Sequence, residues 1–269
     1  MSIFYIIFIF TLGLGVGSFI TAYSYRWPRG ISVKKGRSFC PHCKKKISWY
    51  DNIPLISYLL LGGKCRNCGE KISIRYPLIE FLTAVTFISV YYFLSSCTKL
   101  QSSPICEWQS VLGWWALPYL LTLASILLAI FVIDFEHQLI PDELVFFLIN
   151  ISVFALIIAT NDKLYLFLLS GFGMALFLLL LNLITKGRGM GLGDVKLVIP
   201  LGLILGWPYA LVFLFVSFIL GAVIGLVLIA LKRARFGKHI AFGPFMILAF
   251  LITMFWGDSL VSFLLPWLS

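Results

Sequence analysis

The fold class of this chain is decided by an uncharged run of 35 residues over 197–231, LVIPLGLILGWPYALVFLFVSFILGAVIGLVLIAL. As one helix this run would be about 50 Å long, whereas the hydrocarbon core of a membrane is about 30 Å thick. A natural break lies at Gly206-Trp207-Pro208, because proline cannot donate the backbone hydrogen bond of a helix. The run therefore predicts two membrane-crossing legs, of which the first, 197–206, is short for a full crossing.

Six further apolar stretches extend this pattern along the chain, at 3–25, 77–98, 108–133, 144–161, 164–185 and 240–257. Overall, 61% of the 269 residues are hydrophobic and 12% are charged. Soluble domains are about half apolar and about a quarter charged. The composition excludes a soluble globular enzyme, a disordered chain and a disulfide-stapled secreted module. It predicts an all-α, polytopic transmembrane helix bundle of about eight spans.

Positive charge is concentrated in one segment. Lys and Arg number 21 against 11 Asp and Glu, and twelve of the cations lie between Arg26 and Arg75. With this loop in the cytoplasm and both termini outside, 19 cations lie inside, and Lys99 and Lys163 lie outside. This bias follows the positive-inside rule. We favour anionic membrane lipid over nucleic acid as the partner of the basic segment.

Two Cys-x-x-Cys pairs lie within the basic loop. Cys40, Cys43, Cys65 and Cys68 have the spacing of a zinc ribbon, in which four thiolates hold one tetrahedral Zn²⁺. Two disulfides are the alternative, but a cytoplasmic loop faces a reducing compartment. His42 is a substitute ligand, although four sulfurs suffice. With all four positions filled, the metal would be structural, in a small zinc-ribbon-like cytoplasmic loop.

The chain is expected to divide into an N-terminal module, 1–107, and a transmembrane bundle, 108–269. The module contains two spans and the basic tetra-cysteine loop 26–76. Cys97 and Cys106 fall in a predicted outer loop, where a disulfide and two free thiols are both open.

Two aspartates at predicted span ends are candidates for chemistry. Asp134 ends the stretch 108–133, and Asp194 lies in the glycine-rich segment 189–196. The predicted topology places both at the cytoplasmic face. Two neighbouring carboxyl groups cannot both ionise cheaply, so such a pair can activate a water and protonate a leaving amine.

Other acidic residues near these positions have structural explanations. Glu136, Asp142 and Glu143, and Asp134 itself, are also read as solvated charges at helix ends, and Asp142 follows Pro141, where it could cap the next helix. Glu80 lies one turn into its predicted span. Three explanations remain for its carboxylate: it snorkels to the membrane surface, it pairs with Arg75, or it lines a polar pocket.

An ordered set of motifs resembles the bacterial type IV prepilin peptidases, the leader peptidases and N-methyltransferases, over nearly the whole chain. The motifs are Gly17-Ser18-Phe19, Tyr25-Arg26-Trp27-Pro28, Cys40-Pro41-His42-Cys43, the segment 49–57, Gly63-Lys64-Cys65-Arg66-Asn67-Cys68, Arg75-Tyr76-Pro77-Leu78-Ile79-Glu80, the segment 134–142, Gly191-Leu192-Gly193-Asp194 and Phe242-Gly243-Pro244-Phe245.

This resemblance implies an aspartic endopeptidase of the bacterial inner membrane, with Asp134 and Asp194 as its catalytic pair. It implies prepilins and type II secretion pseudopilins as substrates, cut at the cytoplasmic face. It also implies N-methylation of the new N-terminus by S-adenosylmethionine. No residue is assigned to the methyl-donor site, which we expect in the cytoplasmic loop and the adjacent span ends.

A scaffold or transporter subunit of a secretion system, with a zinc-binding docking loop, is the alternative. A broken helix among eight spans suits a transporter. Almost no charge lies within the spans, however, apart from Glu80, so no ion relay is evident. Under the scaffold hypothesis, replacing Asp134 or Asp194 by Asn would have little effect.

Overall fold

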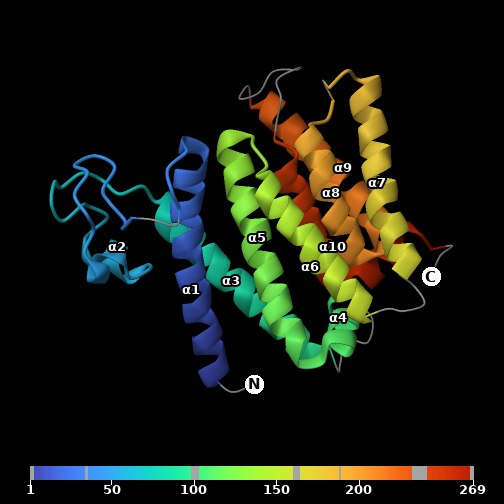
Figure 1. Cartoon of the computed structure of the whole chain (residues 1–269), viewed down its shortest axis with the longest axis horizontal. Coiled ribbons are helices and arrows are strands. Elements are labelled where there is room, and N and C mark those ends of the chain that lie inside the picture. The colour runs from blue at the N-terminus through green and yellow to red at the C-terminus, as the bar shows by residue number, and fades with distance from the viewer. Residues whose placement is uncertain are drawn as a thin grey trace. The chain divides into compact units, whose positions relative to one another are not determined.

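The computed structural model describes residues 3–33, 36–97, 103–159, 164–187, 189–231 and 241–266. Regular structure in this part of the chain is helical, with two isolated β-bridges. The α-helices are α1 (Ile3–Arg26), α2 (Ile56–Leu60), α3 (Arg75–Ser96), α4 (Pro104–Leu112), α5 (Ala116–His137), α6 (Asp142–Ala159), α7 (Leu164–Ile184), α8 (Leu192–Leu205), α9 (Tyr209–Ala230) and α10 (Gly243–Leu264) (Figure 1). The predicted all-α class is confirmed. Lys99, Lys163 and the connection 232–239 lie outside the described residues.

Among the described residues, seven helical segments are long and apolar enough to cross a membrane. They contain α1, α3, the pair α4–α5, α6, α7, α9 and α10. Helix α8 has 14 residues and is about 21 Å long, shorter than a hydrocarbon core of about 30 Å. The seven spans confirm a polytopic transmembrane protein. An eighth crossing through α8, and the predicted orientation, stay predictions.

Two predicted spans differ in detail from the observed helices. The stretch 108–133 is not one continuous helix, because Gly113 adopts φ +53° and separates α4 from α5. The last span extends beyond the predicted end at 257. It runs to Leu264 and includes Asp258, whose carboxylate accepts a hydrogen bond from the Tyr209 hydroxyl. This partner makes an acidic residue tolerable within an apolar helix.

The chain divides into two compact units. Unit 1 comprises Met1–Ser95 and Leu120–Ala129, and unit 2 comprises Ser96–Tyr119 and Ile130–Ser269. The predicted domain boundary between residues 107 and 108 stays a prediction.

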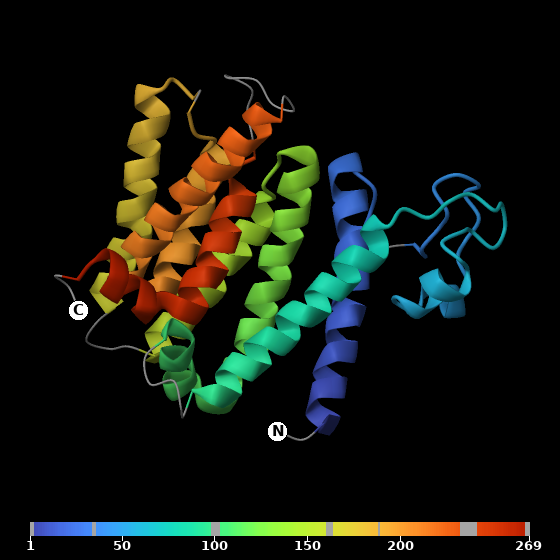
Figure 2. The ribbon, with the colours of Figure 1, turned by 180° about the vertical axis from the view of Figure 1, so that it is seen from behind.

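In unit 1, helices α1 and α3 cross at very short range (Figure 2). A Cβ atom on Gly13 would lie 2.6 Å from the Cα atom of Ala84, and one on Gly17 would lie 2.6 Å from the Cα atom of Glu80. A Cβ atom on Gly15 would meet nothing within 4 Å. Gly13 and Gly17 thus form a small-residue face, four residues apart, that lets the two backbones touch.

Replacing Gly17 by Val is expected to destabilise unit 1 by about 1–3 kcal/mol, because the added atoms would force α3 away from α1. Gly15→Val, which makes the same chemical change on the open face of α1, is the matched control and should leave stability close to that of the parent. The check is the midpoint of thermal unfolding in detergent, followed by tryptophan fluorescence. Equal shifts for the two variants would contradict the close crossing.

In unit 2, α8 packs against α6 and α7, and α9 packs against α10 (Figure 1). The residues of α8 from Leu201 to Leu205 are all buried, as expected for a helix that is apolar all round. The indole nitrogen of Trp108 donates to the carbonyl oxygen of Ile204 at 3.0 Å, which ties α4 to the end of α8. A disulfide joins Cys97 to Cys106, one of the two alternatives left open by the sequence.

Candidate functional site

The two candidate aspartates are buried at helix ends in unit 2. Asp134 lies in the last turn of α5 and is 4% exposed, and Asp194 lies in the first turn of α8 and is 8% exposed. The backbone N–H of Gly191 donates to Oδ2 of Asp194 at 3.2 Å. Oδ2 of Asp134 is buried and has no hydrogen-bond partner among the described residues. A carboxylate oxygen in this state is available to a water or a substrate.

A single side chain, that of Ile140, connects the surroundings of the two aspartates. Its atoms lie 3.2 Å from the position that a Cβ on Gly193 would take and 3.4 Å from the corresponding position on Gly243. Gly193 precedes Asp194, and a Cβ on Gly243 would lie 2.5 Å from Oδ2 of Asp134. The connection between α5 and α6 thereby joins the end of α5 to the starts of α8 and α10.

The carboxyl groups of the two aspartates interact electrostatically. Burial, and after it the negative charge of Asp134, raise the pKa of Asp194 to about 7. Asp194 belongs to α8, which is not among the seven candidate spans. Near neutral pH the pair can therefore hold one shared proton, the state that acid–base hydrolysis by two carboxyl groups requires.

The other acidic residues of this region lie at the surface. Asp142, the first residue of α6, is exposed and accepts a hydrogen bond from the Lys196 ammonium at 2.8 Å. Glu136 is exposed and lies 3.9 Å from His137, and Glu143 is exposed in the first turn of α6. The structural explanation predicted for helix-end charges therefore fits these three residues.

The four cysteines of the basic loop form one cluster in unit 1. The sulfur atoms of Cys40, Cys43, Cys65 and Cys68 all lie within 4.8 Å of one another, and those of Cys40 and Cys68 are 3.9 Å apart. Sulfur atoms around a tetrahedral Zn²⁺ are about 3.8 Å apart, given Zn–S bonds of about 2.3 Å. All four thiols are free, so the alternative of two disulfides is not the observed arrangement. His42 does not belong to the cluster, and its Nε2 atom lies 4.0 Å from Oε2 of Glu70.

The two Cys-x-x-Cys pairs have matching backbone turns. The carbonyl oxygen of Cys40 accepts a hydrogen bond from the N–H of Lys44 at 2.9 Å, and that of Cys65 accepts one from the N–H of Gly69 at 2.9 Å. Lys44 and Gly69 both have positive φ, +57° and +70°. Backbone N–H groups of Cys68 and Asn67 lower the pKa of Cys65 to about 7, which favours the thiolate that a metal needs. The cluster could therefore bind a metal ion.

Metal removal is expected to unfold the loop of unit 1. Few of its side chains are buried, so the metal would replace a hydrophobic core. Loss of a residue that only supports a metal ligand lowers metal affinity about 10- to 100-fold. Cys65→Ser removes a ligand itself, so it should lower metal affinity by more than this. Metal content and protease sensitivity of the loop are the measurements. Cys97→Ser is the control and should retain the metal, and a full metal content in Cys65→Ser would contradict the site.

Sequence reasoning missed the roles of Ile140 and Gly243. Both lie in motifs that carry the family resemblance, but neither side chain is polar or titratable, so no chemical signal marks them. Their importance comes from contacts with residues far away in the chain, which the sequence does not show.

Comparisons with known proteins identify the family to which this chain is similar. The model of the bacterial peptidase A24 N-terminal domain matches residues 11–94, and that of the type IV leader peptidase family matches residues 121–226. A prepilin leader peptidase/N-methyltransferase of Legionella pneumophila is 36% identical over 84% of this chain and 74% of its own length. The proteins of the same name from Pseudomonas aeruginosa and Bacillus subtilis are 33% and 30% identical, over 93% and 95% of this chain and 89% and 96% of their own lengths.

No solved structure matches the chain. The similarity to the curated relatives covers most of both sequences, and the motif resemblance is thereby confirmed. The chain belongs to the prepilin leader peptidase/N-methyltransferase family of multi-pass membrane enzymes.

Proposed function

We propose that this chain removes the basic leader of type IV prepilins and type II secretion pseudopilins, and then methylates the new N-terminal residue. Both steps take place at the cytoplasmic face of the bacterial inner membrane. The names of the relatives support the two activities. The observation that carries the peptidase half is the packing of Ile140 against Gly193 and Gly243, which joins the surroundings of two buried aspartates.

In this proposal Asp134 and Asp194 are the catalytic residues. The ionised carboxyl group of the pair takes a proton from a water, whose oxygen attacks the scissile carbonyl carbon. The protonated carboxyl group supplies a proton as the C–N bond breaks, so that the amine leaves in neutral form. The two residues exchange roles over the cycle, and the proton belongs to the pair rather than to one residue.

A glycine beside Asp194 leaves room for the substrate. Gly191 carries no side chain that would keep an extended backbone away from Asp194, whereas Ile140 takes the space beside Gly193. A peptide bond within a helix is hidden by its own hydrogen bonds. The prepilin must therefore unwind locally, between its basic leader and its apolar helix, to be cleaved.

The four-cysteine cluster has a structural role in this proposal, with Zn²⁺ as its metal. Four thiolates fill a tetrahedral coordination sphere and leave no position for a substrate or a water. Cys40, Cys43, Cys65 and Cys68 would hold the ion and fix the loop between α1 and α3. S-adenosylmethionine, when bound, supplies the methyl group that is transferred to the new N-terminal amine.

The test of the proposed function is incubation of the purified enzyme in lipid vesicles with a prepilin and S-adenosylmethionine. Mass spectrometry of the product should show loss of the leader and the addition of one methyl group. If the parent enzyme leaves both prepilin and pseudopilin intact, the substrate assignment fails and the scaffold or transporter alternative gains support. Cleavage without methylation would restrict the function to its peptidase half.

A further inference from the structure

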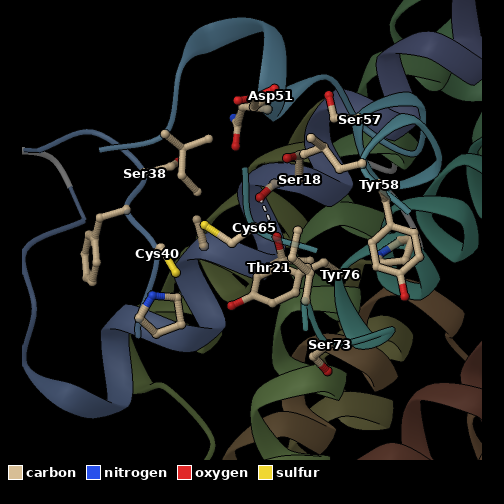
Figure 3. Close-up of a pocket in the computed structure, with 18 of the residues that line it drawn as sticks. Ser18, Thr21, Ser38, Cys40, Asp51, Ser57, Tyr58, Cys65, Ser73 and Tyr76 are labelled. Carbon is tan, nitrogen blue, oxygen red and sulfur yellow. Dashed lines mark hydrogen bonds between the residues drawn. The ribbon is translucent and has the colours of Figure 1, made fainter. Parts of the chain in front are cut away.

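Unit 1 contains a cavity that the peptidase chemistry does not use. Its volume is about 320 Å³, and it lies between the end of α1, the four-cysteine loop and the start of α3. Figure 3 shows Ser18 and Thr21 of α1, Asp51 of the loop and Tyr76 of α3 around it. A volume of this size is at the lower end of the about 300–1,000 Å³ that is typical of small-molecule sites.

A buried carboxylate, that of Glu80, forms part of the cavity wall. Glu80 is 7% exposed, and its Oε2 atom accepts a hydrogen bond from the backbone N–H of Leu55 at 2.9 Å. The Ser18 side chain is a second hydrogen-bonding partner. Both of these donors are uncharged. Two hydrogen bonds hold the carboxylate in place, and neither brings a positive charge to it.

Another carboxylate of the cavity wall, that of Asp51, differs in this respect. The side chain of Asp51 is 9% exposed and accepts hydrogen bonds from Nε of Arg66 at 2.9 Å and from Nη2 at 2.7 Å. A bidentate guanidinium neutralises this charge. A buried charge without a partner is costly, and an ionisable residue inside a membrane span is a functional candidate by default. A ligand with positive charge would supply the missing partner of Glu80.

Part of the lining suits a ligand with a flat, largely apolar part, whereas other parts are charged, with Arg26, Glu70 and Lys71 among them. Tyr58 and Tyr76 contribute aromatic rings, and Ile53 and Leu55 contribute aliphatic surface. Aromatic rings bind flat aromatic groups by stacking and attract cations by their ring faces. S-adenosylmethionine has both features, an adenine ring and a methionine half with sulfonium and ammonium charges, and its size suits a cavity of about 320 Å³.

We propose that this cavity binds S-adenosylmethionine, with Glu80 as the anionic partner of its positively charged methionine half. The inference rests on the methyltransferase half of the proposed function and assigns residues to it. Cys40 and Cys65 also line the cavity, so the metal cluster supports the wall of the donor site. This gives the four-cysteine loop a task in methylation that cleavage at the aspartates does not share.

The test is equilibrium binding of radiolabelled S-adenosylmethionine to the full-length enzyme in lipid nanodiscs, without prepilin. Glu80→Gln keeps the shape of the side chain and removes its charge, so affinity should fall about 10- to 100-fold, the range for loss of a charge-assisted hydrogen bond. Prepilin cleavage by the same variant should stay near the parent rate, which shows that it folds. Glu143→Gln, at an exposed carboxylate of unit 2, is the matched control and should bind as the parent does.

Parent-like binding by Glu80→Gln would overturn the inference, but it would not contradict the proposed methyltransferase activity. If the parent binds no methyl donor, both the inference and the methyltransferase half fail, and continued cleavage would show that the peptidase half survives. A second readout needs no variant. Ultraviolet crosslinking of the radiolabelled donor to the parent should label peptides that contain Ser18, Asp51, Tyr58 or Tyr76, and label confined to unit 2 would overturn the inference.

Discussion

Asp134→Asn and Asp194→Asn are each expected to abolish prepilin cleavage. Asparagine keeps the shape of the side chain but can neither share the proton of the pair nor accept one from water. The loss should be at least the about 10²- to 10⁴-fold that a positioned acid or base contributes. The measurement is the initial rate of leader removal by purified variants in vesicles, with the unfolding midpoint of each variant as a test of its fold.

Asp142→Asn is the matched control for this pair. This substitution makes the same chemical change in the same region, but the carboxylate of Asp142 is exposed and paired with Lys196. An exposed ion pair contributes about 0–1 kcal/mol, so cleavage should stay within a few-fold of the parent. If Asp134→Asn or Asp194→Asn keeps near-parent activity, that aspartate is a helix-end charge, and Asp142 becomes the next candidate.

Gly243→Ala is expected to reduce cleavage strongly, although the substitution adds only one methyl group. Its Cβ would lie 2.5 Å from Oδ2 of Asp134 and 3.4 Å from Ile140, closer to the carboxylate oxygen than real Cβ contacts allow. The carboxylate must therefore move, and a displacement of about 1 Å at a catalytic group costs on the order of 10²-fold in rate. The turnover number should fall more than the affinity for prepilin, because the aspartate and not the substrate contact is displaced.

Gly225→Ala provides the comparison for Gly243→Ala. Gly225 lies in α9, and a Cβ atom there meets nothing within 4 Å. Alanine also favours a helix more than glycine does, by about 1 kcal/mol, so this variant should be as active as the parent and no less stable. Equal rates for the two variants would show that Asp134 tolerates the added methyl group, and Gly243 would then have no positioning role.

The sequence predicts most of the secondary structure because membrane spans are recognisable from their apolar, uncharged composition. Long uncharged stretches must form helices to satisfy their backbone hydrogen bonds in lipid. The errors arise where local geometry competes with composition. Gly113 interrupts a predicted continuous span, and α8 starts at Leu192, five residues before the apolar run. Gly191 is the residue that precedes this helix.

The candidate site is predicted in part for a similar reason. Cysteine pairs and membrane-edge aspartates are chemically distinctive, so Cys40, Cys43, Cys65 and Cys68 stand out in the sequence, and so do Asp134 and Asp194. Their residue types limit what they can do, whatever the fold around them.

The sequence by itself determines the class of this protein. It is an all-helical membrane chain with a loop whose cysteine spacing is typical of metal sites, and with two aspartates as candidate catalytic residues. Only the tertiary structure decides how these residues meet. Ile140 packs against Gly193 and Gly243, although they lie 53 and 103 positions further along the chain. Leu55 donates to Glu80 across 25 positions. Such contacts depend on which helix faces pack against each other. The hydrophobic effect favours burial of apolar helices, but it is non-directional and does not specify which faces meet.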